Sequence, residues 1–251
     1  MFKFTVTIIT KNNASVIEDC IKSVHNLADE IVIVDDFSED KTKEICLKYE
    51  KVRFIQNKLK SIIEQKQYAT DLSANDWVLH LDADERLSEE MRKAILNLTD
   101  KDLQDYSCFA FRRLTYFWGK WLRYGSMYPD YKLRLFNKKF SKWGGINPHD
   151  KIETKGRIKY IPADILHYQN WDLEKYFQRT IMYNKIFAEE IFKKGKRAKW
   201  HHYTIRPFYT FLYRYFFRLG FLDGIQGFVV SVMGAIGTFA KYMFLKEKER
   251  L

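Results

Sequence analysis

Two stretches decide the fold, Ile31-Val32-Ile33-Val34-Asp35-Asp36 and Trp77-Val78-Leu79-His80-Leu81-Asp82-Ala83-Asp84-Glu85. The first opens with an unbroken apolar run, which is typical of a parallel strand buried on both faces, and each stretch runs directly into acidic residues. Short runs at 4–10 and 52–55 predict two further strands. The helix candidates between the strands are residues 16–24, 41–49 and 62–72. Alternating strands and helices predict a doubly wound, mostly parallel α/β sheet, in which both acidic clusters line the crevice at the strand ends.

The composition limits the classes of partner and compartment. With 251 residues, 46% of them hydrophobic and 17% aromatic, the chain is expected to bury a core and not to be disordered. Its net charge of +11 predicts an anionic partner, which is nucleic acid, a phosphorylated sugar or an acidic membrane face. The three cysteines are too widely spaced for a disulfide framework or a zinc site, which indicates a reducing compartment. The N-terminus reads as a strand and not as a signal peptide, so we expect no secretion.

The pair Asp82 and Asp84 suits a divalent metal ion bound to a diphosphate. Hard carboxylate oxygens hold Mg²⁺ or Mn²⁺ while phosphate oxygens complete the coordination shell. Two acids one residue apart are also common in a solvated turn before a helix, and Asp36 has a similar alternative as a helix cap. His167 is open to three interpretations: a metal ligand, a hydrogen-bond donor to a leaving diphosphate, or a structural histidine.

The last third of the chain is basic, aromatic and helical. Residues 193–218 contain eight Lys or Arg and no Asp or Glu. Apolar residues at 208–222 repeat at three and four, which predicts one apolar helical face lying in a membrane interface. Residues 224–240 carry no charge, but their length falls just short of the ~20 apolar residues that a spanning helix needs, and their glycines indicate close packing or re-entry. Interfacial attachment is our preferred interpretation, with a buried core helix as the alternative.

The strand followed by Asp36-Phe37-Ser38-Glu39-Asp40-Lys41-Thr42, with Leu81-Asp82-Ala83-Asp84-Glu85 some forty residues later, resembles glycosyltransferase family 2. The resemblance implies a GT-A fold with a Rossmann-like nucleotide-binding half. It implies that Asp36 contacts the uracil or ribose of the donor, that Asp82 contacts ribose and metal, and that Asp84 binds the metal. Thr10 would touch the nucleoside. Lys66 matches a basic position that the family often has near the donor, although Gln67 departs from the pattern. Lys66 is therefore interpreted either as a partner of the donor diphosphate or as a solvated lysine on a helix surface.

The second half resembles a narrower group, the bacterial lipopolysaccharide core β-glucosyltransferases that act on inner-core heptose. The stretches that carry this resemblance are Tyr128–Phe136, Pro148-His149-Asp150, Ile165–Tyr168 and Gly220–Gly224. In that group a carboxylate at the position of Asp150, usually Glu, is the general base for the acceptor hydroxyl. His149 is either functional or a structural histidine beside a turn. Arg134 and Asp130 are interpreted as an ion pair or as part of the acceptor pocket. One base with no nucleophile on the opposite sugar face implies direct displacement with inversion.

These observations predict a metal-dependent, inverting hexosyltransferase. We expect it to use Mg²⁺ or Mn²⁺ and a UDP-sugar, with UDP-glucose favoured by the resemblance, and to act on lipid-anchored saccharide at the cytoplasmic face of the inner membrane. The catalytic domain would cover 1–190, with a nucleotide-sugar half at 1–108 and an acceptor half at 109–190, and the basic membrane-associating region would cover 191–251. A family 2 transferase for another lipid-linked or surface glycan, a nucleotidyltransferase and a nucleic-acid-binding protein are the alternatives. Acidic strand ends would repel a nucleic acid, so we expect none to bind.

Overall fold

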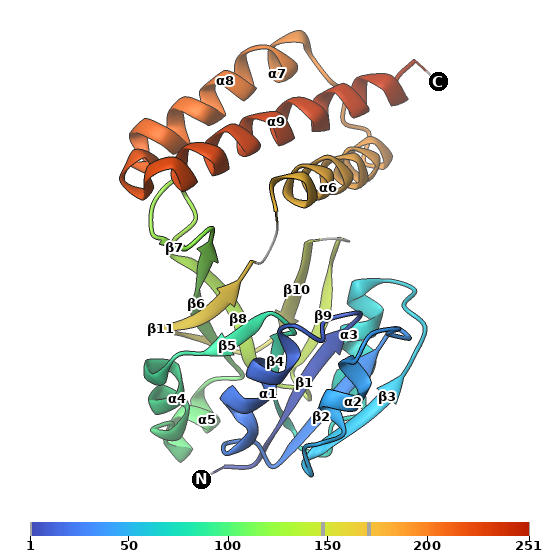
Figure 1. Ribbon diagram of the computed structural model, residues 1–251, viewed down its shortest axis with the longest axis vertical. Helices are drawn as coiled ribbons and strands as arrows, with labels where there is room; N and C mark the ends of the chain where they lie inside the picture. Colours follow the sequence, from blue (N-terminus) through green and yellow to red (C-terminus); the bar gives the residue numbers. More distant parts are fainter. Residues whose placement is uncertain (1, 147–148, 170–171, 251) are drawn as a thin grey trace. The chain divides into compact units, whose positions relative to one another are not determined.

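The computed structural model describes residues 2–146, 149–169 and 172–250 (Figure 1). Contacts within the chain divide it into two compact units. Unit 1 comprises Met1–Arg113, Tyr131–Gly145 and His149–Tyr168. Unit 2 comprises Leu114–Asp130, Ile146–Pro148 and Gln169–Leu251.

Unit 1 is built on one large mixed sheet. The strands that lie wholly or mainly in unit 1, in this sheet or in a separate pair, are β1 (Phe4–Thr10), β2 (Glu30–Asp35), β3 (Val52–Gln56), β4 (Trp77–Asp82), β5 (Glu85–Leu87), β6 (Cys108–Phe117), β8 (Asp130–Asn137), β9 (Ser141–Ile146), β10 (His149–Thr154) and β11 (Ile158–Tyr168). Its helices are α1 (Ile17–His25), α2 (Thr42–Cys46), α3 (Ile62–Asp71), α4 (Glu89–Leu96) and α5 (Asp100–Asp105).

The strand order is β3-β2-β1-β4-β8-β6-β11-β5, and β9 and β10 form a separate pair. The neighbours β3, β2, β1 and β4 are parallel, whereas β8 joins β4 in the antiparallel direction. The predicted α/β architecture is therefore confirmed. Beyond the parallel strands, β8 pairs antiparallel with β4 and β11 pairs antiparallel with β5, and antiparallel neighbours need no crossover helix.

The core of unit 1 follows the apolar patterns in the sequence. Ile31, Val32, Ile33 and Val34 are fully buried, as a central strand covered on both faces requires. In α1 the buried residues Ile17, Cys20, Ile21 and Val24 recur at three and four, so one stripe of the helix faces the sheet. Cys20, Cys46 and Cys108 are free thiols and are all buried in this unit.

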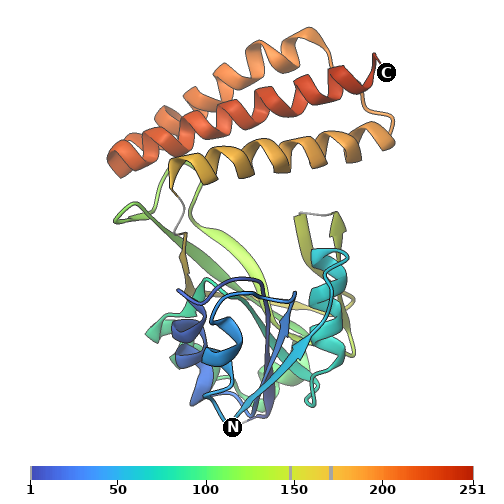
Figure 2. The ribbon, with the colours of Figure 1, turned by 45° about the vertical axis from the view of Figure 1, so that its right-hand side comes forward.

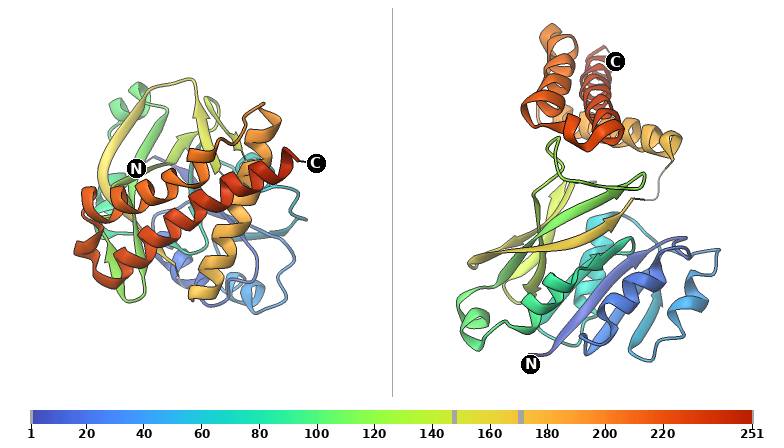
Figure 3. Two further views of the ribbon diagram at one scale, coloured as in Figure 1. Left: turned by 90° about the horizontal axis from the view of Figure 1, so that it is seen from above. Right: turned by 60° about the vertical axis from the view of Figure 1, so that its left-hand side comes forward.

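Unit 2 is mainly helical. Its elements besides the end of β6 are β7 (Lys120–Leu122), α6 (Leu173–Lys193), α7 (Trp200–Tyr203), α8 (Ile205–Leu212), the π-helical turn η1 (Tyr213–Phe217), the 3₁₀ turn η2 (Gly220–Asp223) and α9 (Gly224–Lys248). α9 packs along both α6 and α8, as Figures 2 and 3 show from several directions. The close packing that the glycines of α9 predicted is confirmed at Gly237, where a Cβ atom would lie 2.7 Å from Asn184 Nδ2 of α6.

The predicted single helical face over 208–222 is wrong. The helix ends after η1, where Leu219 adopts a left-handed conformation with φ of 56°. Gly220 follows so closely against the preceding turn that a Cβ atom would lie 2.7 Å from the carbonyl oxygen of Arg214. Leu219 and Leu222 therefore do not continue the face that begins at Phe208.

The helix that contains the uncharged stretch 224–240 is longer than that stretch, because α9 continues through Lys241 to Lys248. Among the described residues, Gly220–Lys248 is long and apolar enough to cross a membrane by length and composition, and 33% of its most apolar window is buried within the protein.

Candidate active site

The parallel strands bring the predicted acidic residues to one edge of the sheet. β1 pairs with β2 so that Thr10 lies opposite Asp35, and β1 pairs with β4 so that Ile9 lies opposite Asp82. Neighbouring strands lie about 5 Å apart, so the ends of β2 and β4 are separated by about 10 Å. The two acidic clusters therefore flank the end of β1.

Asp36 is buried beside the end of β1 and is held on both carboxylate oxygens. Its backbone N–H donates to the carbonyl oxygen of Thr10 at 2.9 Å. One carboxylate oxygen accepts from the backbone N–H of Leu59 at 2.9 Å, and the other is 2.8 Å from Lys11 Nζ. The Leu59 hydrogen bond and the Lys11 ammonium lower the pKa of Asp36. Asp36 is thus a fixed anion, next to the buried Thr10.

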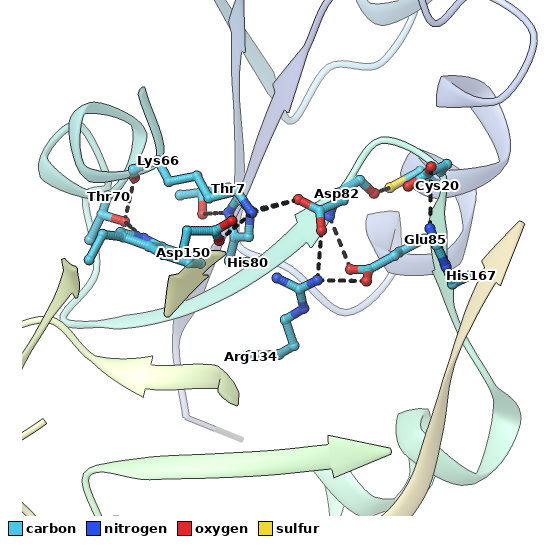
Figure 4. A network of polar contacts seen from close by, with 12 residues as sticks. Thr7, Cys20, Lys66, Thr70, His80, Asp82, Glu85, Arg134, Asp150 and His167 are labelled. Atoms are coloured by element: carbon cyan, nitrogen blue, oxygen red, sulfur yellow. Dashed lines mark hydrogen bonds and ion pairs between the residues drawn. The ribbon is translucent and has the colours of Figure 1, made fainter. Parts of the chain in front are cut away.

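Lys66 connects the strand-end acid Asp82 with Asp150, as Figure 4 shows. Its Nζ atom lies 2.8 Å from Asp82 Oδ1 and 2.9 Å from Asp150 Oδ2. The side chain comes from α3 and is only 4% exposed. Sequence reasoning placed Lys66 near the donor, but it did not predict that Lys66 pairs with these two carboxylates.

Trp143 fixes the position of Lys66. The ammonium lies 4.9 Å from the centroid of the Trp143 ring, which is a cation–π distance. Trp143 Nε1 donates to Thr70 Oγ1 at 3.1 Å, and the Thr70 hydroxyl donates to the carbonyl oxygen of Lys66 at 2.9 Å. The backbone N–H of Trp143 also donates to the side chain of Gln67 at 2.9 Å. One helix and one strand therefore hold the lysine in place.

Arg134 forms the second cationic contact to Asp82. Arg134 Nη2 lies 2.7 Å from Asp82 Oδ2 and 2.6 Å from Glu85 Oε1. Glu85 is fully buried, and its other oxygen accepts from the backbone N–H of Asp82 at 3.1 Å. Although burial opposes it, the two carboxylates raise the pKa of Arg134 above its usual value. These partners are 49 and 52 residues away in sequence, and no local pattern predicts them.

The ionisation of Asp82 follows from these contacts. Burial favours its neutral form, but Lys66 and Arg134 outweigh this and hold the pKa of Asp82 well below the usual range. His80 precedes Asp82 by two residues on the same face of β4. It is fully buried, and its Nδ1 lies 3.1 Å from the Thr7 hydroxyl. Burial and then Lys66 lower the pKa of His80 to about 4. At neutral pH the site therefore contains a charged Asp82 beside a neutral imidazole.

Asp84 and His167 form a second group of potential ligands. His167 Nε2 of β11 lies 3.4 Å from Asp84 Oδ2, which follows β4. The backbone N–H of Tyr168 donates to the carbonyl oxygen of Asp84 at 2.9 Å and holds the two segments together. The predicted metal residues Asp84 and His167 are thus neighbours, although they are 83 residues apart in the chain.

The donor set fits a hard divalent cation that shares its shell with a ligand. Mg²⁺ is commonly bound by one or two protein groups together with phosphate oxygens, and a carboxylate with an imidazole suits Mn²⁺ as well. Within residues 2–146, 149–169 and 172–250, no three His, Cys, Asp or Glu side chains are grouped to hold a metal alone. Both oxygens of Asp82 contact cations, so Asp84 and His167 are the better-placed ligands.

Asp150, the predicted base, lies in β10 with its side chain 17% exposed. It joins Asp82 and Glu85 in one ion-pair chain in which Lys66 and Arg134 supply two positive charges against three negative ones. These five linked side chains therefore carry one excess negative charge. Pro148 and the side chain of His149, which the sequence also singled out, lie outside the described residues.

Comparison with known proteins agrees with this geometry. The model of the family "Glycosyl transferase family 2" matches residues 5–156. An uncharacterized glycosyltransferase of Rickettsia typhi is 30% identical over 98% of this chain and 88% of its own length. The lipopolysaccharide core biosynthesis glycosyltransferase LpsC of Rhizobium meliloti is 26% identical over 92% of this chain and 87% of its own length.

A solved structure shares the fold. The crystal structure of S. aureus TarS 1-349 in complex with UDP-GlcNAc superimposes with a TM-score of 0.52 at 15% identity, covering 99% of this chain and 92% of TarS 1-349. This likeness confirms the predicted GT-A class. Because the family model covers more than half of the chain, and the strand-end acids lie within the matched range, the protein belongs to glycosyl transferase family 2.

Proposed function

We propose that the protein is an inverting, metal-dependent hexosyltransferase that moves a sugar from a UDP-sugar, in particular UDP-glucose, to a lipid-anchored saccharide of the lipopolysaccharide core type. The observation that carries the proposal is the bridge from Lys66 to Asp82 and Asp150. The bridge links Asp82, at the strand end where we place the nucleotide, with Asp150, the proposed base. The two acids are far apart in sequence, so their meeting at one lysine results from the fold. The similarity to LpsC supports the acceptor class.

We assign the donor to the edge formed by β1, β2 and β4. Thr10 and Asp36 would contact the nucleoside, since the fixed carboxylate of Asp36 accepts hydrogen bonds from uracil or ribose. Asp82 would accept from a ribose hydroxyl. The Lys66 ammonium has three N–H donors and uses two of them in its ion pairs, so the third serves a phosphate oxygen.

Asp84 and His167 would hold Mg²⁺ or Mn²⁺ together with the donor diphosphate. When bound, the ion neutralises charge on the departing nucleoside diphosphate. The excess negative charge of the neighbouring ion-pair chain favours a cation at this place. Asp82 serves mainly to position ribose and Lys66, because its own oxygens are already paired.

The transfer itself is a single displacement. Asp150 takes the proton from the acceptor hydroxyl as that oxygen forms a bond to the anomeric carbon. The bond from this carbon to the diphosphate oxygen breaks at the same time, and UDP leaves with the bonding electrons. A single base without a nucleophile on the opposite sugar face gives inversion.

Unit 2 would bring the enzyme to the cytoplasmic face of the inner membrane as a peripheral protein. Large apolar side chains of α8 and η1 are exposed, including Phe208 at 65% and Phe217 at 74%. Arginines lie among them at Arg206, Arg214 and Arg218, and basic residues beside apolar side chains attract anionic lipids. The division into catalytic residues 1–190, with halves at 1–108 and 109–190, and a membrane-associating region at 191–251 remains part of this proposal.

The test is sugar transfer by the purified protein. The acceptor is the truncated lipopolysaccharide of a strain from which the gene for this protein has been deleted. We expect release of UDP from one UDP-hexose and a gain of one hexose by mass spectrometry, both abolished by EDTA and restored by Mn²⁺. Release of pyrophosphate in place of UDP would identify a nucleotidyltransferase. An unchanged core in the deletion strain, together with no transfer from any UDP-hexose, would refute the proposal.

A further inference from the structure

Unit 2 contains a pocket that has no part in the transfer described above. Its volume is about 220 Å³, and it is lined by Arg123, Tyr124, Ser126, Tyr128, Phe217, Arg218 and Leu219. The lining residues come from two segments, the loop after β7 and the end of η1, which both belong to unit 2. We propose that this pocket binds the phosphate of a lipid headgroup. The inference refines the membrane attachment in the proposed function and rests on it.

The two walls of the pocket are held together by hydrogen bonds. Gly125 N–H donates to the carbonyl oxygen of Arg218 at 2.9 Å. The buried carboxylate of Asp223 accepts from the backbone N–H groups of Arg123 and Tyr124 at 3.0 and 2.8 Å. These bonds join the β7 loop to the segment before α9. The pocket is therefore preformed, which lowers the entropic cost of binding a ligand.

Two of the five described non-glycine residues with a left-handed backbone line this pocket. Ser126 and Leu219, neither of them glycine, adopt left-handed conformations with φ of 69° and 56°. Such conformations cost roughly 1–3 kcal/mol each and cluster at ligand sites. Two strained residues that line one pocket point to a role that the packing of the helices alone does not require.

The chemistry of the lining suits an anion with several acceptor oxygens. Arg123 and Arg218 supply guanidinium groups that form no ion pair with any described residue. Ser126, Tyr124 and Tyr128 add hydroxyl groups. The nearby acid, Asp223, is 2% exposed and directs its carboxylate to backbone N–H groups, so it does not neutralise the arginines. Arginine with hydroxyl donors is a favourable combination for phosphate.

The surroundings favour a lipid over a free phosphate. Phe217 and Leu219 line the pocket and are 74% and 44% exposed, and Phe221, Leu222 and Ile225 follow at 43%, 47% and 62%. A soluble anion would leave these apolar side chains in water. A headgroup in the pocket instead places them at the level of the acyl chains, where their transfer from water is favourable.

The experiment is sedimentation of the full-length protein with two kinds of phosphatidylcholine vesicle, matched in surface potential. One contains phosphatidic acid, with an exposed phosphomonoester, and the other contains phosphatidylserine. Wild type is expected to prefer the phosphatidic acid vesicles. The double variant Arg123→Gln/Arg218→Gln should lose about tenfold affinity for them and retain little preference. The matched control, Lys194→Gln/Lys196→Gln, removes the same charge from unit 2 outside the pocket and should weaken both vesicle types equally.

Equal behaviour of the two double variants would overturn the proposal, because the arginines would then contribute charge alone. Tight binding of inorganic phosphate, with displacement of the vesicles, would overturn the assignment to a lipid. A thermal melt of each variant shows that it is folded, and the single variant Arg123→Gln serves if the double variant is not. Calorimetry with UDP and Mn²⁺ is run in parallel, so that failure to bind donor is separated from failure to bind lipid.

Discussion

The ammonium of Lys66 lies 2.9 Å from the carboxylate of Asp150 and 2.8 Å from that of Asp82, so one buried cation is shared by the proposed base and the proposed donor site. The position of the proposed base is therefore tied, through a single ammonium, to the position of the proposed donor site.

Asp150→Asn should abolish transfer while leaving donor binding intact. A positioned base contributes roughly 10²–10⁴ in rate, so kcat is expected to fall in that range, as measured by UDP release. Asp150→Glu should retain much more activity, and Glu153→Gln, a surface change on the same strand β10, should have little effect. A loss of less than tenfold in Asp150→Asn would remove this residue from the role of base.

Lys66→Met should destabilise unit 1, because it leaves Asp82 and Asp150 without their shared cation. Removing one partner from a buried ion pair costs roughly 3–5 kcal/mol, and we expect a change of about 3 kcal/mol in the free energy of unfolding in urea. Lys66→Arg keeps the charge and should lower the free energy of unfolding by less. A change under about 1 kcal/mol in Lys66→Met would show that the bridge is energetically unimportant.

Asp84→Asn and His167→Gln should weaken Mn²⁺ binding in the presence of UDP. Loss of one ligand is expected to raise the dissociation constant about 10- to 100-fold, measured by electron paramagnetic resonance of free Mn²⁺. Asp105→Asn, an exposed change at the end of α5, is the control. If both ligand variants bound Mn²⁺ as wild type does, the metal would have to be held elsewhere.

His80 should make stability depend on pH between about 4 and 6.5. Its pKa is lowered from 6.5 to about 4 in the folded protein, so the unfolded chain binds more protons in this window. Its contribution is therefore complete above pH 6.5 and is lost as pH falls toward 4, by about 3 kcal/mol for a shift of this size. Urea titrations across this range should show a shallower slope for His80→Gln than for His201→Gln, and equal slopes would contradict the prediction.

The exposed aromatics of unit 2 should govern membrane attachment. Transferring a phenylalanine side chain from water is worth about 1.5–3 kcal/mol, so Phe208→Ser and Phe217→Ser should each weaken vesicle binding about tenfold or more. Phe140→Ser provides the comparison, since Phe140 is 56% exposed but lies in unit 1. Binding that is insensitive to the changes in unit 2, or equally sensitive at Phe140, would argue against attachment through α8 and η1.

Local patterns predicted the parallel half of the sheet and the residues at its edge. The run from Ile31 to Val34 is buried on both faces, and four consecutive apolar residues are enough to predict this from the sequence. The partners of Lys66 and Arg134 were not predictable in this way, because they come from strands that are far apart in sequence and that meet only when the sheet has formed. The helix break at Leu219 was missed for a different reason. The apolar repeat continues past it, whereas the left-handed backbone of Leu219 and the close approach of Gly220 to the carbonyl oxygen of Arg214 in the preceding turn leave no mark in the spacing of apolar residues.

The burial of all three cysteines in unit 1 makes the native protein resistant to thiol reagents. Burial raises the pKa of Cys20, of Cys108 and, to about 12, of Cys46, so neither thiolate nor access is provided in the folded state. Cys20 is the most informative of them, because its Sγ lies 3.6 Å from the carbonyl oxygen of Asp82. The rate at which Cys20 is alkylated would therefore report how often the structure opens around Asp82, and a UDP-sugar bound at the proposed donor site is expected to slow that reaction.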